Sequence, residues 1–321
     1  MTVLVTGGAG FIGSTLVDRL LTEGHSVLCV DNFDPYYDPA LKRANLEAAL
    51  RHPSFSLIES DIRSRDELRS PVGDARPDAI VHIAARAGVR PSLEDPHLYV
   101  DVNVHGTLNL LDAAREFGTA KLVVASTSSV YGAETEVPFR EDAALLSIVS
   151  PYAASKLAME ALCHTYAAVH GLSIVVLRLF TVYGPRQRPD MAIHTFTRHI
   201  DEGLPIQLYD YGRSYRDYTY VDDIVSGFTA ALRYDDARWC IANLGGGRPT
   251  ELRALVSEIE KALGKTALVR ETAAADGDVP RTLADITRAR EALGYDPKVT
   301  IEDGVPRFVA WYRQQRRKVS S

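Results

Sequence analysis

A tyrosine and a lysine stand four residues apart in the segment Tyr152-Ala-Ala-Ser-Lys156. In a helix, this spacing places both side chains on one face. A free phenol titrates at about pH 10 and is a poor base at neutral pH, but a neighbouring cation lowers its pKa. The pair could therefore exchange a proton with a substrate hydroxyl group. Most such pairs only pack on a surface, so the interpretation depends on the other motifs of the chain.

The N-terminal segment supplies the first of these motifs. The apolar run at residues 3–5 is followed by GAGFIG at residues 8–13 and then by a helical pattern of leucines. Strand, glycine turn and helix in this order bind a dinucleotide, because the backbone can approach the pyrophosphate and the helix N-terminus offers free N–H groups. Asp31 ends the next apolar run. In a dinucleotide-binding fold, an acid at this position accepts hydrogen bonds from the adenosine ribose hydroxyl groups. No Arg or Lys lies between Asp31 and Lys42, so NAD is favoured over NADP.

A cluster of hydroxyl groups follows the apolar run at residues 122–125. Residues 126–132 read STSSVYG. Ligands bind at the carboxyl ends of the strands in open α/β sheets, so hydroxyl groups in this position suit a substrate site. Such clusters also occur in ordinary turns, and this one gains weight only beside the other two motifs.

The composition bounds the class of protein. The 321 residues are 46% hydrophobic and 24% charged, as in a globular protein of one large or two moderate domains. A net charge of −6 argues against a nucleic-acid partner, and no apolar run reaches the roughly 18 residues of a membrane span. Cys29, Cys163 and Cys240 lie in apolar segments without metal-ligand spacing. With no segment resembling a signal peptide, we expect reduced thiols, no metal and a cytoplasmic protein.

Apolar runs alternate with helical patterns through the first half of the chain. We expect strands at residues 3–5, 27–30, 55–58, 79–83, 122–125 and 174–177. We expect helices near residues 11–22, 66–72, 98–117 and 152–170. This alternation predicts an α/β fold, a doubly wound parallel Rossmann sheet with helices on both faces.

The pattern changes after about residue 183. A breaker-rich loop at 184–190 precedes a smaller α/β portion. There we expect helices near 192–201, 223–233, 250–263 and 305–316, strands near 206–209, 218–221 and 242–244, and a flexible loop at 273–277. We therefore predict a dinucleotide-binding domain over 1–183, to which about 222–245 return, and an interleaved lobe over 184–321.

The three motifs together resemble the extended short-chain dehydrogenases/reductases that act on nucleotide sugars. The resemblance spans the whole chain and extends to the Arg-Asp-Tyr at residues 216–218. It implies that Tyr152 and Lys156 are the catalytic pair, with Thr127 as their hydroxyl partner, and that the second lobe mainly binds the nucleotide sugar. The cofactor-binding residues that it implies, for NAD, are Gly7, Gly10, Phe11, Ile12, Gly13, Asp31, Asn32, Asp61, Ile62, Ala84, Ala85, Arg86, Asn103, Tyr152 and Lys156.

Finer motifs resemble the UDP-glucuronate 4-epimerases. They are DNFDPYYDPALKR at 31–43, AARAGVR at 84–90, FTVYGP at 180–185 and RPDM at 188–191. The resemblance implies NAD-dependent inversion at C4 of UDP-glucuronate, through a transient 4-keto sugar, to UDP-galacturonate. Arg188 suits the sugar carboxylate, since a guanidinium offers it a bidentate fork. The substrate-binding residues expected are Arg86, Ser128, Thr181, Arg188, Arg216, Asp278 and Arg281.

Other activities remain open. UDP-glucose 4-epimerases and UDP-glucuronate decarboxylases usually carry Asn where Thr181 stands, and 4,6-dehydratases carry an Asp-Glu pair where Ser128 and Ser129 stand. Gln187 stands where the subfamily often has Gly. A UDP-glucose or UDP-pentose 4-epimerase, or a dehydratase or decarboxylase, is therefore an alternative. A net redox enzyme and a non-catalytic NAD-binding protein are alternatives of other classes.

The expected partners are few. The helices predicted at 98–117 and 152–170 carry apolar residues on more than one face. Family members commonly pair these helices in a four-helix bundle, so the resemblance implies a homodimer. Beyond a second copy and a UDP-sugar substrate, we expect no nucleic-acid or membrane partner.

Overall fold

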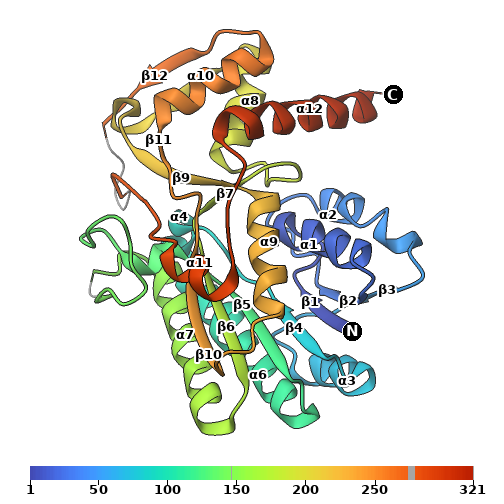
Figure 1. The fold of residues 1–321 in the computed structure, drawn as a ribbon. Coiled ribbons are helices and arrows are strands. Elements are labelled where there is room, and N and C mark those ends of the chain that lie inside the picture. Colours follow the sequence, from blue (N-terminus) through green and yellow to red (C-terminus); the bar gives the residue numbers. More distant parts are fainter. Residues whose placement is uncertain (146, 274–278, 321) are drawn as a thin grey trace.

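A parallel sheet of seven strands forms the larger lobe (Figure 1). The computed structural model describes residues 1–145, 147–273 and 279–320. The sheet order is β10-β6-β5-β4-β1-β2-β3. Its strands are β1 (Thr2–Thr6), β2 (Ser26–Asp31), β3 (Phe55–Glu59), β4 (Ala79–His82), β5 (Lys121–Thr127), β6 (Ser173–Leu179) and β10 (Trp239–Leu244). The predicted doubly wound sheet is confirmed, with its switch point between β1 and β4.

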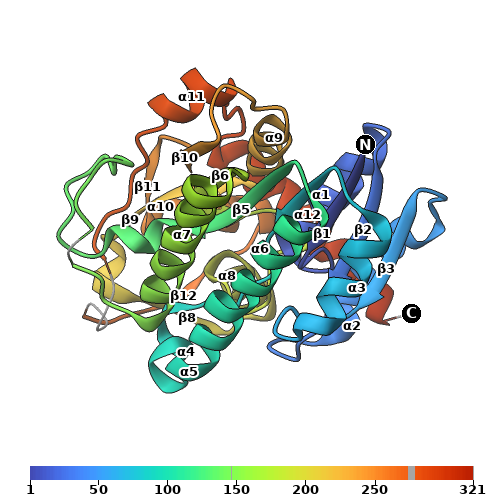
Figure 2. The ribbon, with the colours of Figure 1, turned by 90° about the horizontal axis from the view of Figure 1, so that it is seen from below.

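Helices cover both faces of this sheet. On one face, α1 (Phe11–Thr22) packs against α9 (Val221–Leu232). On the other lie α3 (Arg65–Ala75), α6 (Gly106–Phe117) and α7 (Pro151–His170), with α6 and α7 side by side (Figure 2). Successive strand residues point to opposite faces, so Leu4 joins one buried cluster while Val3 joins the other. Burial on both faces explains the continuous apolar runs.

The second lobe contains α8 (Ala192–Glu202), α10 (Leu252–Leu263) and α12 (Ile301–Ser320). One small sheet joins β11 (Pro249–Glu251), β9 (Tyr215–Tyr220) and β7 (Thr181–Tyr183), and another joins β12 (Leu268–Glu271) to β8 (Pro205–Leu208). After β9 the chain returns to the larger lobe as α9 and β10, where Trp239 pairs with Ile174 of β6. Residues 274–277 of the predicted flexible loop lie outside the described residues.

Several short elements did not follow from the sequence patterns. They are α2 (Pro39–Asn45), α4 (Val89–Glu94), α11 (Thr287–Leu293), β7, β11 and β12. None of them is longer than seven residues. A segment of this length holds too few residues to display a helical or alternating period.

The helix predicted at 98–117 is present as one continuous helical stretch, but it is not α-helical throughout. A π-helical turn at Asp101–His105 separates α5 (Pro96–Val100) from α6. Such a turn inserts a residue and shifts the phase of the helix. Asn103 lies in this turn and is fully buried. At this interruption the polar side chain of Asn103 is hydrogen-bonded to the backbone of Arg86, in the loop after β4.

The three cysteines are buried and unpaired, as predicted. They lie in β2, α7 and β10 of the larger lobe. Within the described ranges, no helix combines the length and apolar character needed to cross a membrane.

A buried ion pair joins β5, β6 and α7. Arg178 on β6 donates hydrogen bonds of 3.0 and 2.8 Å to Glu160 on α7. Ser126 on β5 donates a third to the same carboxylate at 2.5 Å. The Arg178 guanidinium also lies 4.9 Å from the centre of the Tyr131 ring. Because separating such a pair leaves an uncompensated buried charge, the three elements are held in fixed positions.

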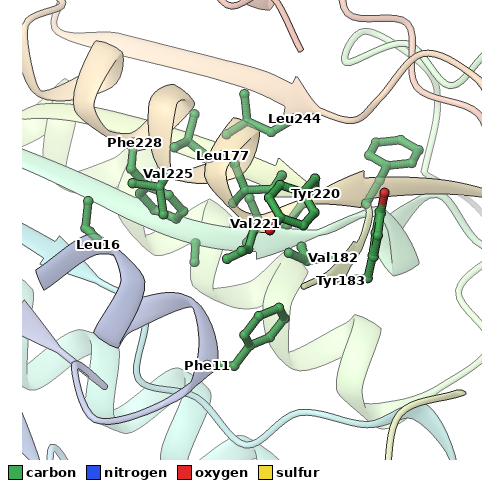
Figure 3. Packing of buried hydrophobic residues seen from close by; sticks show 14 of the residues in the cluster. Phe11, Leu16, Leu177, Val182, Tyr183, Tyr220, Val221, Val225, Phe228 and Leu244 are labelled. Carbon is green, nitrogen blue, oxygen red and sulfur yellow. The ribbon is translucent and has the colours of Figure 1, made fainter. Parts of the chain in front are cut away.

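Leu16 tests the core between α1 and α9, which Figure 3 shows together with Val225 and Phe228. Leu16 is 0% exposed. We expect Leu16→Ala to lower the free energy of unfolding by about 3 kcal/mol, because it leaves a cavity. Leu268→Ala removes the same atoms from a side chain that is 59% exposed, and should cost less than about 0.5 kcal/mol. Urea denaturation of both variants measures the difference, and equal losses would contradict this placement of the core.

Candidate active site

One cleft lies at the carboxyl ends of the central strands and reaches into the second lobe. Its volume is about 440 Å³, within the range of small-ligand sites. The glycine turn, the segments that follow β2, β4 and β5, helix α7 and the loop after β7 all contribute to its wall. The predicted residues that line it are Gly7, Gly10, Phe11, Ile12, Gly13, Asp31, Asn32, Asp61, Ile62, Ala84, Ala85, Arg86, Thr127, Ser128, Tyr152, Lys156, Thr181 and Arg188.

The glycine turn closes one end of the cleft. Gly7 has a φ of +72°, and a Cβ there would lie 2.6 Å from the Ala84 nitrogen. A Cβ on Gly13 would lie 2.1 Å from the Gly7 oxygen, so only glycine lets α1 pack this closely on the turn. The first N–H groups of α1 have no acceptor within the helix. The turn therefore presents backbone donors to a ligand.

Gly8, the first glycine of the template and not one of the assigned cofactor-binding residues, is placed differently from the other glycines of the turn. Of the template at residues 8–13, Gly10 and Gly13 line the cleft, whereas Gly8 does not. A Cβ on Gly8 would lie 2.5 Å from the Cys29 sulfur, so Gly8 packs on β2 instead. Gly7 takes its place in the wall, and the glycines that face the cleft recur every third residue.

Asp31 connects the end of β2 to this turn. Its carboxylate accepts hydrogen bonds from the backbone nitrogens of Ala9, at 3.1 Å, and Phe33, at 2.9 Å. The Lys42 ammonium lies 3.9 Å from the same group. Lys42 of α2 thus lies beside the acid, although it is eleven residues further along the chain.

Asn32 and Asp61 are paired at the same end of the cleft. The Asn32 amide donates to the Asp61 carboxylate at 2.9 Å. Arg63 donates to Asp61 as well and, as the main cause, lowers the pKa of this carboxyl to about 2. The acid is therefore ionised at any physiological pH.

Two buried polar atoms in the cleft wall have no hydrogen-bond partner among the described residues. They are the Tyr37 hydroxyl and the Arg86 Nε. An unpaired buried donor is costly, so both atoms are suited to a bound ligand. Together with the glycine turn and Asp31, they form a site that fits a dinucleotide.

Asn103 lies behind this wall and does not line the cleft. Its amide oxygen accepts from the Arg86 nitrogen at 2.8 Å. Its amide nitrogen donates to the Arg86 oxygen at 3.0 Å and to the Ser155 hydroxyl at 2.9 Å. Asn103 therefore holds the backbone of Arg86 against α7, with its amide groups directed to the protein.

Thr127, Tyr152 and Lys156 all line the cleft. Thr127 ends β5, and its hydroxyl accepts from the Ser129 nitrogen at 3.2 Å. Tyr152 and Lys156 lie on the first turns of α7, as their spacing predicted. The Lys156 ammonium donates to the Ala125 carbonyl at 2.8 Å, and burial lowers its pKa to about 8.

The expected effect of the lysine on the tyrosine is wrong for this structure. Burial raises the pKa of Tyr152 above its ordinary value. A hydrogen bond with Thr127 and the charge of Arg188 act in the opposite direction, while the Lys156 ammonium is turned to the Ala125 carbonyl. The cation that lowers the pKa of Tyr152 is therefore Arg188, in the loop after β7.

Arg188 enters the cleft from that loop and is already paired. It donates to Asp190 through Nε at 3.0 Å and Nη2 at 2.8 Å. Its guanidinium also lies 5.1 Å from the centre of the Tyr36 ring. Tyr36 lines the cleft, and neither it nor Asp190 was assigned a role from the sequence. Tyr36 lies in the motif at 31–43 and Asp190 in the motif at 188–191. Their place in these motifs could have indicated that they belong to the site.

Gln187, which stands where the UDP-glucuronate 4-epimerases often have Gly, does not line the cleft. Its side chain is buried, and its amide nitrogen donates to the Val182 oxygen at 3.1 Å. The backbone oxygen of Gln187 accepts from His194 at 2.8 Å. The side chain therefore fills the base of the loop and does not line the cleft.

Arg216 and Arg281 lie outside the residues that line the cleft. They meet at Tyr215 in the second lobe. Arg216 donates to the Tyr215 oxygen at 2.9 Å, and the Arg281 guanidinium lies 5.5 Å from the Tyr215 ring. Asp278 falls outside the described residues, so its role stays a prediction.

Comparison with known proteins gives a consistent set of relatives. The profile of the NAD dependent epimerase/dehydratase family matches residues 3–245. A UDP-glucuronate 4-epimerase of Thermodesulfobacterium geofontis is 42% identical over 319 residues, which are 99% of this chain and 98% of that protein. A probable UDP-glucuronate 4-epimerase of Rhizobium meliloti is 39% identical over 336 residues, covering 99% of this chain and 98% of that protein.

Solved structures agree with the sequence relatives. UDP-glucuronic acid 4-epimerase from Bacillus cereus, in complex with UDP-glucuronic acid and NAD, is similar with a TM-score of 0.92 and 36% identity over 98% of this chain and 100% of that one. UDP-glucose 4-epimerase from Thermotoga maritima, with UDP-glucose, gives a TM-score of 0.90 and 31% identity over 98% and 100% of the two chains.

The buried ammonium of Lys156 makes a prediction about stability. Its pKa of about 8 lies below the 10.5 of a free lysine, so the unfolded chain binds more protons between these values. Stability of the ligand-free protein should therefore rise with pH in this window, by roughly 3 kcal/mol from this group. Lys156→Met should lack that rise. Urea denaturation from about pH 7 to about pH 10 measures the difference between the two proteins, and parallel curves would contradict a depressed pKa.

Proposed function

The chain belongs to the NAD dependent epimerase/dehydratase family, and from that premise we propose that it is an NAD-dependent UDP-glucuronate 4-epimerase. The product is UDP-galacturonate, and the sugar passes through a transient 4-keto form. One observation carries the proposal. A tyrosine, a threonine hydroxyl and a buried lysine share a cleft with the glycine turn and with Arg188.

Tyr152 is the proton-transfer group in this proposal. NAD, when bound, would accept the C4 hydrogen as hydride and would give it back to the opposite face of C4, and its positive charge would favour the phenolate. The Tyr152 oxygen takes the proton of the C4 hydroxyl, directly or through Thr127. Lys156, which lines the same cleft and is bonded to β5 through the Ala125 carbonyl, supports this step, and the cleft holds the sugar in reactive geometry. The 4-keto sugar then turns, and Tyr152 returns the proton to the inverted carbon's oxygen.

The sugar carboxylate sets the substrate preference. When buried it must be paired or hydrogen-bonded. Thr181 at the start of β7 and Ser128 after β5 offer hydroxyl groups, and Arg188 offers a charge. A 4-keto uronate is a β-keto acid that loses CO₂ readily, so these groups must hold the carboxylate out of the orientation that favours decarboxylation.

Further residues have supporting roles in this proposal. Asn103 acts through Arg86, which faces the bound cofactor or substrate. Arg216 and Arg281, with Asp278, contact the uridine ribose and diphosphate from the second lobe. The dinucleotide domain comprises residues 1–183 with the return at about 222–245, and the nucleotide sugar binds mainly to 184–321.

The second candidate is 4-epimerisation of a neutral UDP-sugar. The similarity to a UDP-glucose 4-epimerase supports it, since the fold and the catalytic group are common to both. Thr181 and Arg188 favour the uronate. Dehydration is disfavoured because Ser128 and Ser129 supply no acid or base at the positions where dehydratases carry Asp and Glu.

The reaction itself is the first prediction from this proposal. Purified protein, incubated without added cofactor, should convert UDP-glucuronate to UDP-galacturonate, resolved by chromatography. UDP-glucose should react more slowly or not at all. Conversion of UDP-glucose alone would keep the catalytic group and reject the roles of Thr181 and Arg188. Release of CO₂ or a UDP-pentose at a comparable rate would reject the role given to the carboxylate site.

Tyr152→Phe tests the proton-transfer group. We expect kcat to fall by about 10²–10⁴-fold, because the phenol oxygen is removed while the ring remains. Tyr234→Phe makes the same change just after α9, outside the cleft, and should leave kcat within about twofold. A Tyr152→Phe variant with near-normal kcat would exclude Tyr152 as the base.

The assembly is a further prediction. We expect a homodimer in which α6 and α7, which lie side by side on one face of the sheet, pack against the same helices of a second copy (Figure 2). Light scattering of the purified protein should give twice the mass of one chain. A mass of one chain, at concentrations well above those of the activity assay, would contradict it.

A further inference from the structure

Five side chains form a continuous stack along the cleft, in the order Asp34, Arg86, Tyr36, Arg188, Asp190. They come from three loops, after β2, after β4 and after β7. The Arg86 guanidinium donates to Asp34 at 2.7 Å and lies 4.3 Å from the centre of the Tyr36 ring. Arg188 lies 5.1 Å from the same ring, and binds Asp190 through two hydrogen bonds. One aromatic ring thus contacts two guanidinium groups, each neutralised by its own carboxylate.

Tyr36 is held firmly at the centre of this stack. Its backbone nitrogen donates to Asp34 at 2.9 Å. Gly88 has a φ of +115°, and a Cβ there would lie 3.0 Å from the Tyr36 hydroxyl. The glycine therefore leaves room for the hydroxyl, which lies near enough to Asp190 to lower the pKa of that carboxyl. Tyr36 therefore joins the loop after β2 to the loop after β7, which carries Arg188.

Asp190 determines both the orientation and the charge of Arg188. Burial raises the pKa of Asp190, but the hydrogen bonds and the charge of Arg188 outweigh burial, so the pKa lies below its ordinary value and the group stays ionised. Asp190 occupies the edge of the guanidinium formed by Nε and Nη2. The end that carries Nη1 remains for a second carboxylate. That second carboxylate meets a cation whose charge Asp190 already partly balances.

We propose that Asp190 and Tyr36 are positioning residues that fix the Arg188 guanidinium and moderate its attraction for the sugar carboxylate. The inference rests on the proposed function, since it concerns the turning of a 4-keto uronate within the cleft. An unmoderated arginine would bind substrate, intermediate and product tightly alike. Uniform binding of this kind lowers KM without helping kcat, and a strong ionic contact opposes the turn. The stack therefore lowers the affinity of the cleft for the sugar carboxylate, and the 4-keto sugar can turn more easily.

Asp190→Asn tests this inference because it keeps the shape of the side chain and removes its charge. For UDP-glucuronate we expect KM and kcat both to fall by about tenfold, the scale of one charged hydrogen bond. Affinity for UDP-glucose, which carries no carboxylate, should change by less than about twofold when measured by calorimetry. Tyr36→Phe keeps the ring but removes the hydroxyl, and should shift KM and kcat in the same direction by a smaller factor.

A matched control lies on the surface. Asp142 binds Arg140 through the same two guanidinium atoms, at 3.1 and 3.2 Å, and both side chains are exposed. Asp142→Asn makes the same chemical change at an equivalent pair outside the cleft, and should leave KM and kcat unchanged.

The outcomes separate this inference from the proposed function. A higher KM for UDP-glucuronate in Asp190→Asn, an unchanged kcat, or equal effects on both sugar nucleotides would overturn the moderating role alone. Failure of the unaltered protein to epimerise UDP-glucuronate would overturn the proposed function, and this inference with it. A lower melting temperature with equal loss of affinity for both nucleotides would show that Asp190 is only structural.

Discussion

The site depends on a buried lysine ammonium that is bonded to β5, the strand that ends at Thr127. The Lys156 ammonium donates a hydrogen bond to the Ala125 carbonyl. One turn further along α7, the Glu160 carboxylate accepts a hydrogen bond from the Ser126 hydroxyl. Two consecutive residues of β5 are thus bonded to α7, directly before Thr127. Because charged groups are costly to bury without partners, this part of the molecule has little freedom. Thr127 and Tyr152 therefore face each other as parts of one rigid unit.

The groups proposed to recognise the sugar are attached differently. Thr181 and Arg188 come after β6, in β7 and in the loop that follows it, and so lie outside the rigid unit. Arg188 contacts the ring of Tyr36 across the cleft. A second contact of the same kind joins the lobes, since the Arg90 guanidinium lies 4.8 Å from the Tyr209 ring. Chemistry is thus fixed by buried charge, and recognition by stacked, partly exposed side chains. Such a division leaves specificity open to change while the reaction stays the same.

Sequence patterns predicted the long elements and the residues at strand ends, because both depend on local periodicity and on strand order. The strands of the large sheet were placed within a few residues, and eighteen assigned residues line the cleft. Local patterns could not indicate the π-helical turn at Asp101–His105, since one inserted residue barely alters the period. The contact of Tyr36 with Arg188 joins positions far apart in sequence. Its residues were visible in motifs, but their meeting depends on the folded chain.

The return of the chain from the second lobe to β10 affects how the protein is made. Strand β6 is synthesised well before its neighbour β10, because the paired residues Ile174 and Trp239 lie far apart along the chain. On the ribosome, the growing chain passes through the small lobe while the edge of β6 is still open. An open edge of a buried, apolar strand is a template for pairing with other chains. Translation that stops after β9 would therefore release an aggregation-prone fragment, and the two lobes must fold together.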